Sequence, residues 1–409
     1  MNLFNMEKFL AFAFLMVALP SSGMVSGVPS PPSIRPSLLH LSAANSDFAL
    51  RLYRQIAAQP GTESQNILFS PLSISAALSM LSLGAQEDTL TQLLQVLGYS
   101  NITRNDAVRV GQVFQKLLEH VSNLSDRLKV GSSLYVQKGQ EIREKFLREA
   151  EKLYKAKAVT VDFRDQQRTK DEINAYVSNK TEGKIPNILE KPPSQDTVML
   201  LLNYIFFRGE WLKSFDRRDT YEADFHVDRR TTVKVQMMRR KGKYSVTYAK
   251  DLSSDVLLME YSRNTSLLIL LPRPGKLAEV ERKLTVQKFY QLLTSIRMRS
   301  VDVHLPKMIL KKDYQLKTLL SSMGIKNAFT SSANFSGLSE WPLQVSEVMQ
   351  RAILKVDERG TTASASTKKE ITQLSAPLKF KCNRPFLLLI ADKYIKSVIF
   401  AGRVTNPTA

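Results

Sequence analysis

The sequence predicts one large α+β domain that extends from residue 46 to residue 409. Three observations lead to this fold class. Some segments carry apolar residues at helical spacing, and others are near-continuous apolar runs typical of buried strands. These two kinds of segment mix without a regular strand–helix–strand repeat. Finally, neither an internal repeat nor a linker-like segment divides this part of the 409-residue chain.

The chain is expected to begin with a secretory signal peptide at residues 1–23. Lys8 precedes an apolar run over residues 9–19, and Pro20 with small residues after it supplies a cleavage region. This run is too short for a membrane span, which needs about 20 residues, so we expect a secreted, extracellular protein. Residues 24–45 form a proline-rich lead-in, of which residues 24–41 should be poorly ordered.

Helices are predicted where apolar residues recur on one face. Phe48, Leu52 and Ile56 follow a cap at Asn45 or Ser46. A second helix begins at Ser70, a cap residue followed by proline, and ends at Gly84. Further helical stretches fit residues 107–122, 142–156, 167–179, 278–296 and 313–323.

Strands are predicted from two different patterns. Residues 198–207, 267–271 and 386–390 are near-continuous apolar runs, as in strands that are buried on both faces. Residues 233–237 alternate between apolar and polar side chains, which is typical of a strand with one exposed face.

The composition excludes several classes of site. Cys382 is the only cysteine, so an intrachain disulfide framework and a cysteine-cluster metal site are ruled out, and we expect a buried thiol. The four histidines never occur at a metal-ligand spacing, and no nucleophile-elbow, zinc-protease, Walker or dinucleotide motif is found. We therefore expect no enzyme, no metal site and no cofactor.

The chain is strongly basic, and five N-x-[ST] sequons agree with an extracellular destination. The 58 Lys and Arg residues exceed the 38 Asp and Glu residues, which gives a net charge of +20 and favours polyanionic partners. Nucleic acid is not expected, because the basic clusters lack interleaved aromatic residues. The predicted glycosylation sites are Asn101, Asn123, Asn179, Asn264 and Asn334.

Residues 358–377 are unusually rich in small side chains for a segment that precedes an apolar strand set. Their composition alone is typical of a flexible loop. However, the small residues Thr361, Ala363, Ala365 and Thr367 fall on one face at a period of two. Such a segment could also pair between two existing strands with little steric conflict.

Motifs distributed from residue 48 to residue 407 resemble the serpin family, and within it the antitrypsin-like plasma serpins. They are residues 66–71 (NILFSP), 181–185 (TEGKI), 203–211 (NYIFFRGEW), 225–226 (FH), 235–238 (VQMM), 304–307 (HLPK), 356–361 (VDERGT), 383–386 (NRPF) and 400–407 (FAGRVTNP). The resemblance implies about nine helices around three β-sheets, with an exposed reactive-centre loop near the C-terminus.

The resemblance also implies a function, that of a monomeric suicide inhibitor. A serine protease attacks the loop and forms a covalent acyl-enzyme, and the cleaved loop then inserts into the central sheet as a new strand. The hinge of this loop would be Glu358, Gly360, Thr361, Thr362, Ala363, Ser364, Ala365, Ser366 and Thr367. The region that opens to admit the loop would contain Ser70, Ser73, Asn203, Trp211 and Gln350.

Counting seventeen residues from Glu358, as in related inhibitors, places the scissile bond at Leu374–Ser375. A leucine at this position favours a chymotrypsin-like, cathepsin G-like or elastase-like protease, because a trypsin-like pocket needs Arg or Lys. Three residues depart from the family pattern. Gln350 stands where many relatives have His, and its amide could still form a hydrogen bond with Asn203. Thr362 stands where inhibitors usually carry Glu, and Lys369 would point inward after insertion, where an unpaired ammonium is costly.

Two other functions remain open at the level of sequence. One is a non-inhibitory serpin that carries a small hydrophobic ligand. The other is an inhibitor of a clotting protease that depends on a cofactor, since residues 350–351, 356–361 and 370–372 resemble protein Z-dependent protease inhibitor.

Two basic clusters are candidates for binding heparin or a related glycosaminoglycan, with a merely solvated basic surface as the alternative. The first cluster is Arg282, Lys283, Lys288, Arg297 and Arg299, and the second is Arg229, Arg230, Lys234, Arg239, Arg240, Lys241 and Lys243.

Overall fold

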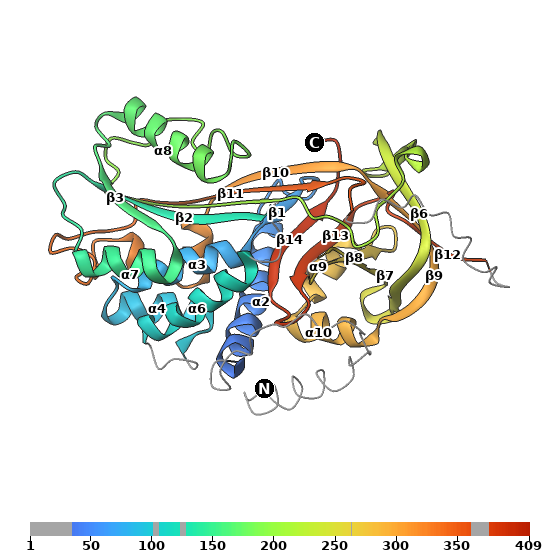
Figure 1. Ribbon diagram of the computed structural model, residues 1–409, viewed down its shortest axis with the longest axis horizontal. Coiled ribbons are helices and arrows are strands. Elements are labelled where there is room, and N and C mark those ends of the chain that lie inside the picture. The colour runs from blue at the N-terminus through green and yellow to red at the C-terminus, as the bar shows by residue number, and fades with distance from the viewer. Residues whose placement is uncertain (1–34, 101–105, 123–127, 263, 361–375) are drawn as a thin grey trace.

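The computed structural model describes residues 35–100, 106–122, 128–262, 264–360 and 376–409. These residues form two β-sheets with helices on several sides, in one elongated α+β body (Figure 1). The predicted fold class is therefore confirmed. Within the described ranges, none of the helices is both long enough and apolar enough to cross a bilayer.

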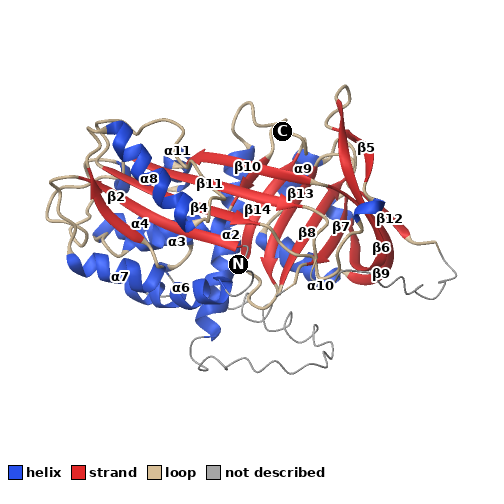
Figure 2. Cartoon of the chain, turned by 45° about the horizontal axis from the view of Figure 1, so that its top comes forward, coloured by secondary structure: helices blue, strands red, loops and turns tan. Residues whose placement is uncertain are grey.

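The first sheet has five strands and carries the candidate site. Its order is β10 (Met308–Gln315), β11 (Glu347–Val356), β4 (Met199–Phe207), β2 (Leu128–Gln137) and β3 (Lys157–Val161). Strands β11 and β4 run parallel, and β4 has antiparallel β2 on its other side. Figure 2 shows these strands crossing the upper part of the molecule.

The second sheet has nine strands. Along its main path lie β1 (Ile67–Phe69), β14 (Val398–Val404), β13 (Phe386–Asp392), β8 (Thr265–Pro272), β7 (Ser254–Glu260), β6 (Thr232–Ala249), β9 (Arg297–Pro306) and β12 (Leu378–Lys381). Strand β5 (Tyr221–His226) pairs with β6 off this path.

The family resemblance predicts three sheets, whereas the described strands form two hydrogen-bonded sheets. The reason is the length of β6, which has 18 residues. Its first part pairs with β5 and its last part with β7, while β9 pairs across both parts. One continuous strand therefore joins what would otherwise be two separate sheets.

Nine α-helices lie in the described residues. They are α2 (Arg35–Ala57), α3 (Pro71–Ser82), α4 (Glu87–Leu97), α6 (Ala107–Ser122), α7 (Glu144–Tyr154), α8 (Gln166–Lys180), α9 (Leu277–Lys283), α10 (Val286–Ser295) and α11 (Lys317–Met323). Helix α8 covers one face of the five-stranded sheet, and α3, α4, α6 and α7 lie on the other side (Figure 1).

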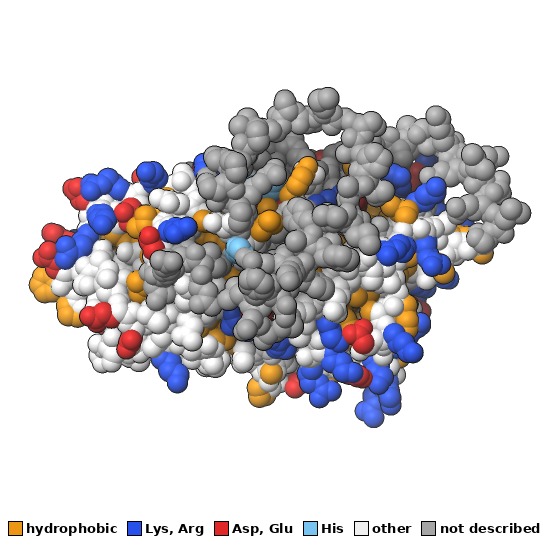
Figure 3. All heavy atoms as spheres, turned by 90° about the horizontal axis from the view of Figure 1, so that it is seen from below, with side chains coloured by type: hydrophobic (Ala, Val, Ile, Leu, Met, Phe, Trp, Pro, Cys, Tyr) orange, Lys and Arg blue, Asp and Glu red, His pale blue; other side chains and the backbone are white. Residues whose placement is uncertain are grey.

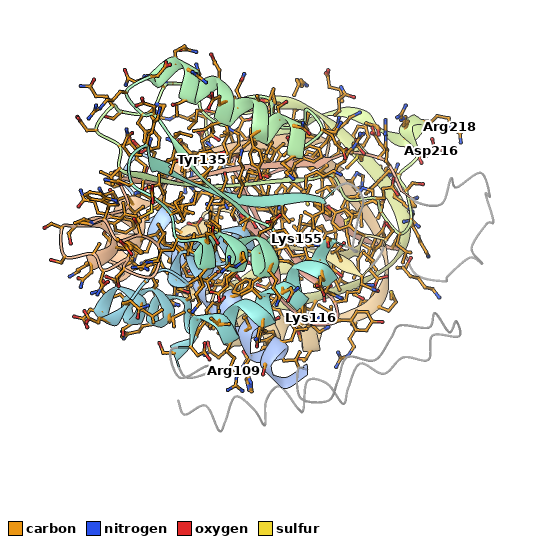
Figure 4. The ribbon with its side chains drawn as sticks, turned by 60° about the vertical axis from the view of Figure 1, so that its left-hand side comes forward. Arg109, Lys116, Tyr135, Lys155, Asp216 and Arg218 are labelled. Carbon is orange, nitrogen blue, oxygen red and sulfur yellow. The ribbon has the colours of Figure 1, made fainter. Side chains whose placement is uncertain are left out.

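Strand β4 separates two cores, because alternate side chains of a strand point to opposite faces. Met199, Leu201 and Ile205 belong to the main core. Leu200 and Leu202 belong to a smaller core beneath α8, together with Tyr135 of β2, which lies under that helix in Figure 4. The near-continuous apolar run in this strand is therefore explained by burial on both faces.

Three sequence predictions of local structure are wrong. Residues 35–41 of the lead-in are helical rather than poorly ordered, because α2 begins at Arg35 and Leu41 is buried in the main core. Neither Asn45 nor Ser46 is a cap, because both lie inside α2, where Asn45 donates to the carbonyl of Val398 at 2.9 Å. The predicted helix 313–323 begins only at Lys317, because residues up to Gln315 pair with β11.

Two other predicted helices begin where the sequence places them, and one predicted helix is two helices in the structure. Helix α6 has the predicted bounds, and α3 begins at Pro71 after its Ser70 cap. The stretch 278–296 is divided into α9 and α10, because Leu284 leaves the helix and the Thr285 side chain caps the next one by accepting from the backbone N–H of Lys288.

Candidate functional site: the hinge and the seam of the five-stranded sheet

The centre of the five-stranded sheet contains a parallel seam between β4 and β11. The register places Gln350 opposite Asn203. Strand β11 ends at Val356, and the chain continues through residues 357–360 toward the small-residue segment. A segment that follows β11 and turns back between these two strands would run antiparallel to both of them. Antiparallel pairing on either side would then replace one parallel pair, which is slightly less stable per residue.

The side chain of Gln350 joins the two strands of the seam to α3. Its Nε2 lies 3.0 Å from the carbonyl oxygen of Ser70, 2.7 Å from Oγ of Ser73 and 2.7 Å from Oδ1 of Asn203. Its Oε1 accepts from the backbone N–H of Ser70 at 3.0 Å. Gln350 is 1% exposed and Asn203 is fully buried, so this network holds its members in a place where water does not compete.

Asn203 makes a second connection across the same seam. Its Nδ2 donates to the carbonyl of Met349 in β11 at 2.9 Å, and Ser73 lies 3.1 Å from its Oδ1. The structure thus brings Ser70, Ser73, Asn203 and Gln350 into one cluster. It also contains the hydrogen bond from Gln350 to Asn203 that the sequence led us to expect.

Trp211 lies apart from that cluster, beyond the end of β4. There it holds residues 357–360, which lead from β11 into the hinge. Its indole N–H donates to the carbonyl of Asp357 at 2.7 Å, and its backbone N–H donates to the carbonyl of Arg359 at 3.0 Å. The ring is 1% exposed and stacks on Tyr261 with a centroid distance of 4.2 Å. A Cβ at Gly360 would lie 2.6 Å from the carbonyl oxygen of Trp211, so glycine is required for this close approach.

Two buried carboxylates fix the hinge to neighbouring strands. Asp357 is 4% exposed and forms an ion pair with Arg208 at the end of β4. Glu358 is 5% exposed, lies 3.2 Å from Nζ of Lys307 and accepts from the hydroxyl of Thr220 at 3.1 Å. Burial alone raises the pKa of Glu358, but its backbone hydrogen bond and Lys307 outweigh burial and leave the pKa below the usual value.

Arg351 joins the other face of the seam to the connection between α8 and β4. Its guanidinium forms an ion pair with Asp313 of β10 and donates to Glu190 at 3.0 Å. A cavity of about 780 Å³ lies beside these residues, between α8 and the sheet. Sequence reasoning missed the contact with Glu190, because the two residues are 161 positions apart and no local pattern links them.

Some of the remaining predicted site residues lie in the described part of the chain, and others lie outside it. The scissile residues Leu374 and Ser375, the hinge residues from Thr361 to Thr367, and the sequons at Asn101 and Asn123 lie outside the described residues. Asn179, at the end of α8, and Asn264, in a turn, are exposed. Asn334 donates through Nδ2 to the carboxylate of Glu87 at 3.1 Å.

The first heparin candidate cluster is partly neutralised by neighbouring acids. Lys283 pairs with Glu279 at 2.5 Å, and Lys288 pairs with Asp251. Arg297 donates to the carbonyl of Thr294 in its own connection at 2.8 Å. Arg282 and Arg299 are exposed. These contacts reduce the charge that the cluster presents to a polyanion.

Comparison with known proteins identifies the family. A family model described as Serpin (serine protease inhibitor) matches residues 43–407. Alpha-1-antitrypsin from Meriones unguiculatus is 43% identical over 373 residues, which cover 90% of this chain and 91% of the relative. Alpha-1-antiproteinase 2 from Equus caballus is 41% identical over 373 residues, which cover 90% of this chain and 88% of the relative.

Solved structures give the same result. Mouse protein-Z dependent protease inhibitor matches with a TM-score of 0.85 at 32% identity, covering 92% of this chain and 99% of that structure. Human thyroxine-binding globulin, solved with its ligand, matches with a TM-score of 0.84 at 33% identity, covering 91% of this chain and 100% of that structure. This chain therefore belongs to the serpin family, which is described as a family of serine protease inhibitors and not of enzymes.

Proposed function

We propose that this protein is a secreted suicide inhibitor of a chymotrypsin-like serine protease. The protease cleaves the bond between Leu374 and Ser375 and remains attached as an acyl-enzyme. Residues 361–373 then insert between β4 and β11 as a new strand. As an extended strand, these residues span about 40 Å at roughly 3.3 Å each, which is enough to carry the bound protease far from where it docked.

The observation that carries the proposal is the parallel seam with its continuous exit from β11. Only residues 357–360 separate the inserting segment from β11, so this short connection is the one that has to rearrange. Its antiparallel direction supplies hydrogen bonds to both neighbours. Insertion must break the contacts of Gln350 and Asn203 across the seam, so these contacts oppose it until cleavage frees the loop.

The hinge contacts support the same sequence of events. Residues 357–360 are held outside the seam by Trp211 and by the ion pairs of Asp357 and Glu358. These contacts hold the start of the loop away from the sheet before cleavage. Because they involve only the first residues of the loop, their release permits insertion to proceed from that end.

The primary specificity follows from Leu374, which would fill an apolar primary pocket. Cleavage at Lys368 or Lys369 by a trypsin-like protease would come too early in the loop to leave a full strand, and we expect it to inactivate the inhibitor. The inward direction of Lys369 is tolerated if its ammonium reaches solvent near the end of the sheet.

The test is incubation with chymotrypsin, cathepsin G, elastase, thrombin and factor Xa, followed by a denaturing gel and sequencing of the released peptide. We expect a denaturation-resistant complex with a chymotrypsin-like protease, and a peptide that begins at Ser375. Clean cleavage without a complex would contradict the inhibitory function. A complex that forms only with factor Xa and a protein cofactor would instead support the cofactor-dependent alternative, which the similarity to protein-Z dependent protease inhibitor favours.

The second candidate function is transport of a small hydrophobic ligand, which the similarity to thyroxine-binding globulin favours. One pocket beside α10 has a volume of about 220 Å³ and is lined in part by Lys250, Asp251 and Lys288. Pockets that bury a drug-sized ligand usually measure about 300–1,000 Å³ and are mostly apolar. The larger cavity between α8 and the sheet, of about 780 Å³, has the right size, but charged side chains such as Lys170, Lys184 and Arg351 line much of it. The small size of the first pocket and the charge of the second cavity therefore favour inhibition over transport.

We also propose that residues 1–23 direct secretion and that exposed sequons carry glycans. Asn179 and Asn264 are the best placed among the described sequons because both are exposed. Asn334 is less accessible because of its contact with Glu87. Mass spectrometry of the secreted protein, before and after removal of N-glycans, tests both statements by the new N-terminus and by the modified positions.

A further inference from the structure

The geometry points to a second contact between this inhibitor and its target. We infer that the outward face of β6, β9 and β12 is a docking surface for an acidic patch on the protease. This basic face is formed by Arg239, Lys241, Lys243, Lys379 and Lys381. The inference rests on the proposed inhibitory function and names a feature of the target that the scissile bond does not specify.

The strand register places these cations on one face. Arg239 lies opposite His304, which is paired in turn with Lys381. Lys241 lies opposite Asp302, which is paired with Lys379. Residues two apart on a strand share a face, so Lys243 continues the same row. Neighbouring strands lie about 4.8 Å apart, and the side chains therefore form a dense grid.

The opposite face of these strands belongs to the core. Met238 and Tyr244 of β6 and Val301 and Val303 of β9 are buried. The cations consequently cannot turn inward, and they extend toward solvent. Figure 3 shows Lys and Arg side chains gathered toward the right-hand end of the molecule, which carries β6 and β9.

This face holds much more positive than negative charge. Asp302 is the acid at its centre, and Arg239 already binds it through two hydrogen bonds of 3.0 and 2.7 Å. Asp224 of β5 lies near Lys381 at the edge of the face, but it forms its ion pair with Lys234. Within the described part of the chain, the four lysines of the basic face form no ion pair. The contrast with the first heparin candidate cluster is clear, because Lys283 and Lys288 there are paired with acids.

His304 lies close to several of these cations, and their charges affect its pKa. Its ring is buried, and its Nδ1 lies 2.8 Å from the hydroxyl of Tyr221. Burial lowers the pKa of His304, and the charges of Arg239, Lys379 and Lys381 lower it further, although Asp302 opposes them. The histidine therefore stays neutral at physiological pH, and the positive field of the basic face comes from the lysines.

The position of the basic face identifies the partner. Strand β12 begins at Leu378, four residues beyond Leu374, and Lys379 follows. An extended chain covers at most about 3.6 Å per residue, so Lys379 lies within about 18 Å of the scissile residue along the chain. A typical interface buries about 800 Å² on each partner, equivalent to a disc of about 16 Å radius. A protease at this bond therefore lies beside Lys379, which is the edge of the basic face nearest to the bond.

Charge complementarity at such a surface acts mainly on the rate of association. Opposite charges steer the encounter, and salt weakens this steering. The inhibitor should consequently select, among proteases that accept leucine in the primary pocket, those with an acidic surface around the active site. A sulfated polysaccharide is the other ligand that this charge would attract, and the experiment must separate the two.

The experiment compares two chymotrypsin-like proteases that both cleave after leucine but have opposite surface charge. The triple variant Lys241→Glu, Lys243→Glu, Lys379→Glu is measured against the wild-type chain at 50 and 300 mM NaCl. We expect association with the acidic protease to slow at least tenfold at low salt, with a much smaller difference at high salt. The basic protease should associate with the variant no more slowly than with the wild-type chain.

The matched control is Lys138→Glu, Lys145→Glu, Lys152→Glu, which changes the net charge equally on exposed residues around α7, at the opposite end of the molecule. If both triple variants slow association equally, net charge rather than this surface is responsible, and the inference is wrong. The corresponding Lys→Gln triple repeats the test if the Glu variant lowers the unfolding midpoint.

Binding to a protease whose catalytic serine is replaced by alanine separates this inference from the proposed function. That complex needs no cleavage and no insertion. Salt-sensitive binding that the variant loses would support the basic face even if the wild-type chain trapped no protease. Equal binding by wild-type and variant chains, together with selective loss of a heparin hexasaccharide by the variant, would assign the face to polysaccharide and overturn the inference.

Discussion

Nε2 of Gln350 lies 2.7 Å from Oδ1 of Asn203, across the parallel seam between β11 and β4. The next residue along β11 is Arg351, whose side chain lies on the opposite face of the sheet. It donates to Glu190 in the connection that leads to β4. Consecutive residues of β11 therefore form two bridges on opposite faces of the sheet, a buried one to β4 and an outer one to the connection before β4. We expect opening of the seam to break both bridges, and each can be removed by a single substitution.

The Gln350→Leu variant removes the buried bridge and leaves the backbone N–H of Ser70 without its partner, whereas Oδ1 of Asn203 keeps its contact with Ser73. Each unsatisfied buried group costs about 1–3 kcal/mol, so we expect the unfolding midpoint to fall and inhibitory activity to decay faster during storage at 37 °C. Gln350→His is the matched control, because a ring N–H can still donate to a neighbour. Equal stability of the Leu variant and the wild-type chain would contradict a structural role for this network.

The Glu190→Gln variant tests the outer bridge. Glu190 is 76% exposed, so its contribution to equilibrium stability should be below about 1 kcal/mol. Arg351 keeps its ion pair with Asp313. We expect a synthetic peptide of residues 361–373 to insert about two- to fivefold faster into the variant at low salt, because opening the seam no longer breaks this bridge.

High salt should remove the difference between Glu190→Gln and the wild-type chain, since exposed ion pairs are screened. Glu144→Gln is the matched control, because its ion pair with Arg148 lies on α7, within one helix and away from the seam. Identical insertion rates for the wild-type chain and Glu190→Gln at low salt would show that Arg351 does not restrain the sheet through this contact.

The seam contains contacts that could be predicted from the sequence and contacts that could not. Gln350 and Asn203 could be assigned to one region because family motifs place them there, and their residue types allow a hydrogen bond. The partners of Arg351 could not be assigned in this way. They depend on how the connection after α8 passes over β11, and tertiary packing decides this rather than any local periodicity.

Among the helices and strands, too, some could be predicted from local patterns and others could not. Helix α6 was predicted with its observed bounds because its apolar residues recur on one face. The strand β10 was missed because Lys311, Lys312 and Asp313 give it a polar sequence. This strand is at the edge of its sheet, where polar side chains are common. Proline near the start of α2 suggested disorder, whereas Pro36 in the first turn is compatible with a helix.

The His120→Asn variant should reveal a pH-dependent contribution to stability. Nε2 of His120 on α6 lies 2.9 Å from Oδ2 of the buried Asp392. The hydrogen bond to Asp392 raises the pKa of His120, although burial opposes this. Because the folded-state pKa is raised, the stabilisation is complete below the unfolded value of about 6.5 and is lost as pH rises through the folded value.

We therefore expect the unfolding midpoint of the wild-type chain to exceed that of His120→Asn at pH 6, by the equivalent of about 1 kcal/mol. The difference should shrink by pH 8.5. Asp392 stays hydrogen-bonded in the variant, because it also accepts from the backbone N–H groups of Tyr394 and Ile395. A difference that does not change between pH 6 and pH 8.5 would refute a role for the protonated ring.

Loop insertion itself is tested by Thr361→Arg. If residues 361–373 become a strand with Thr361 on its inward face, the variant must bury a guanidinium without a partner, which costs several kcal/mol. We expect cleavage to continue while the trapped complex disappears, so that more than ten molecules of inhibitor are consumed for each protease inhibited. Thr362→Arg is the matched control, because alternation along the strand points that residue outward, and it should remain an inhibitor. Unchanged inhibition by Thr361→Arg would mean that this segment does not insert in the proposed register.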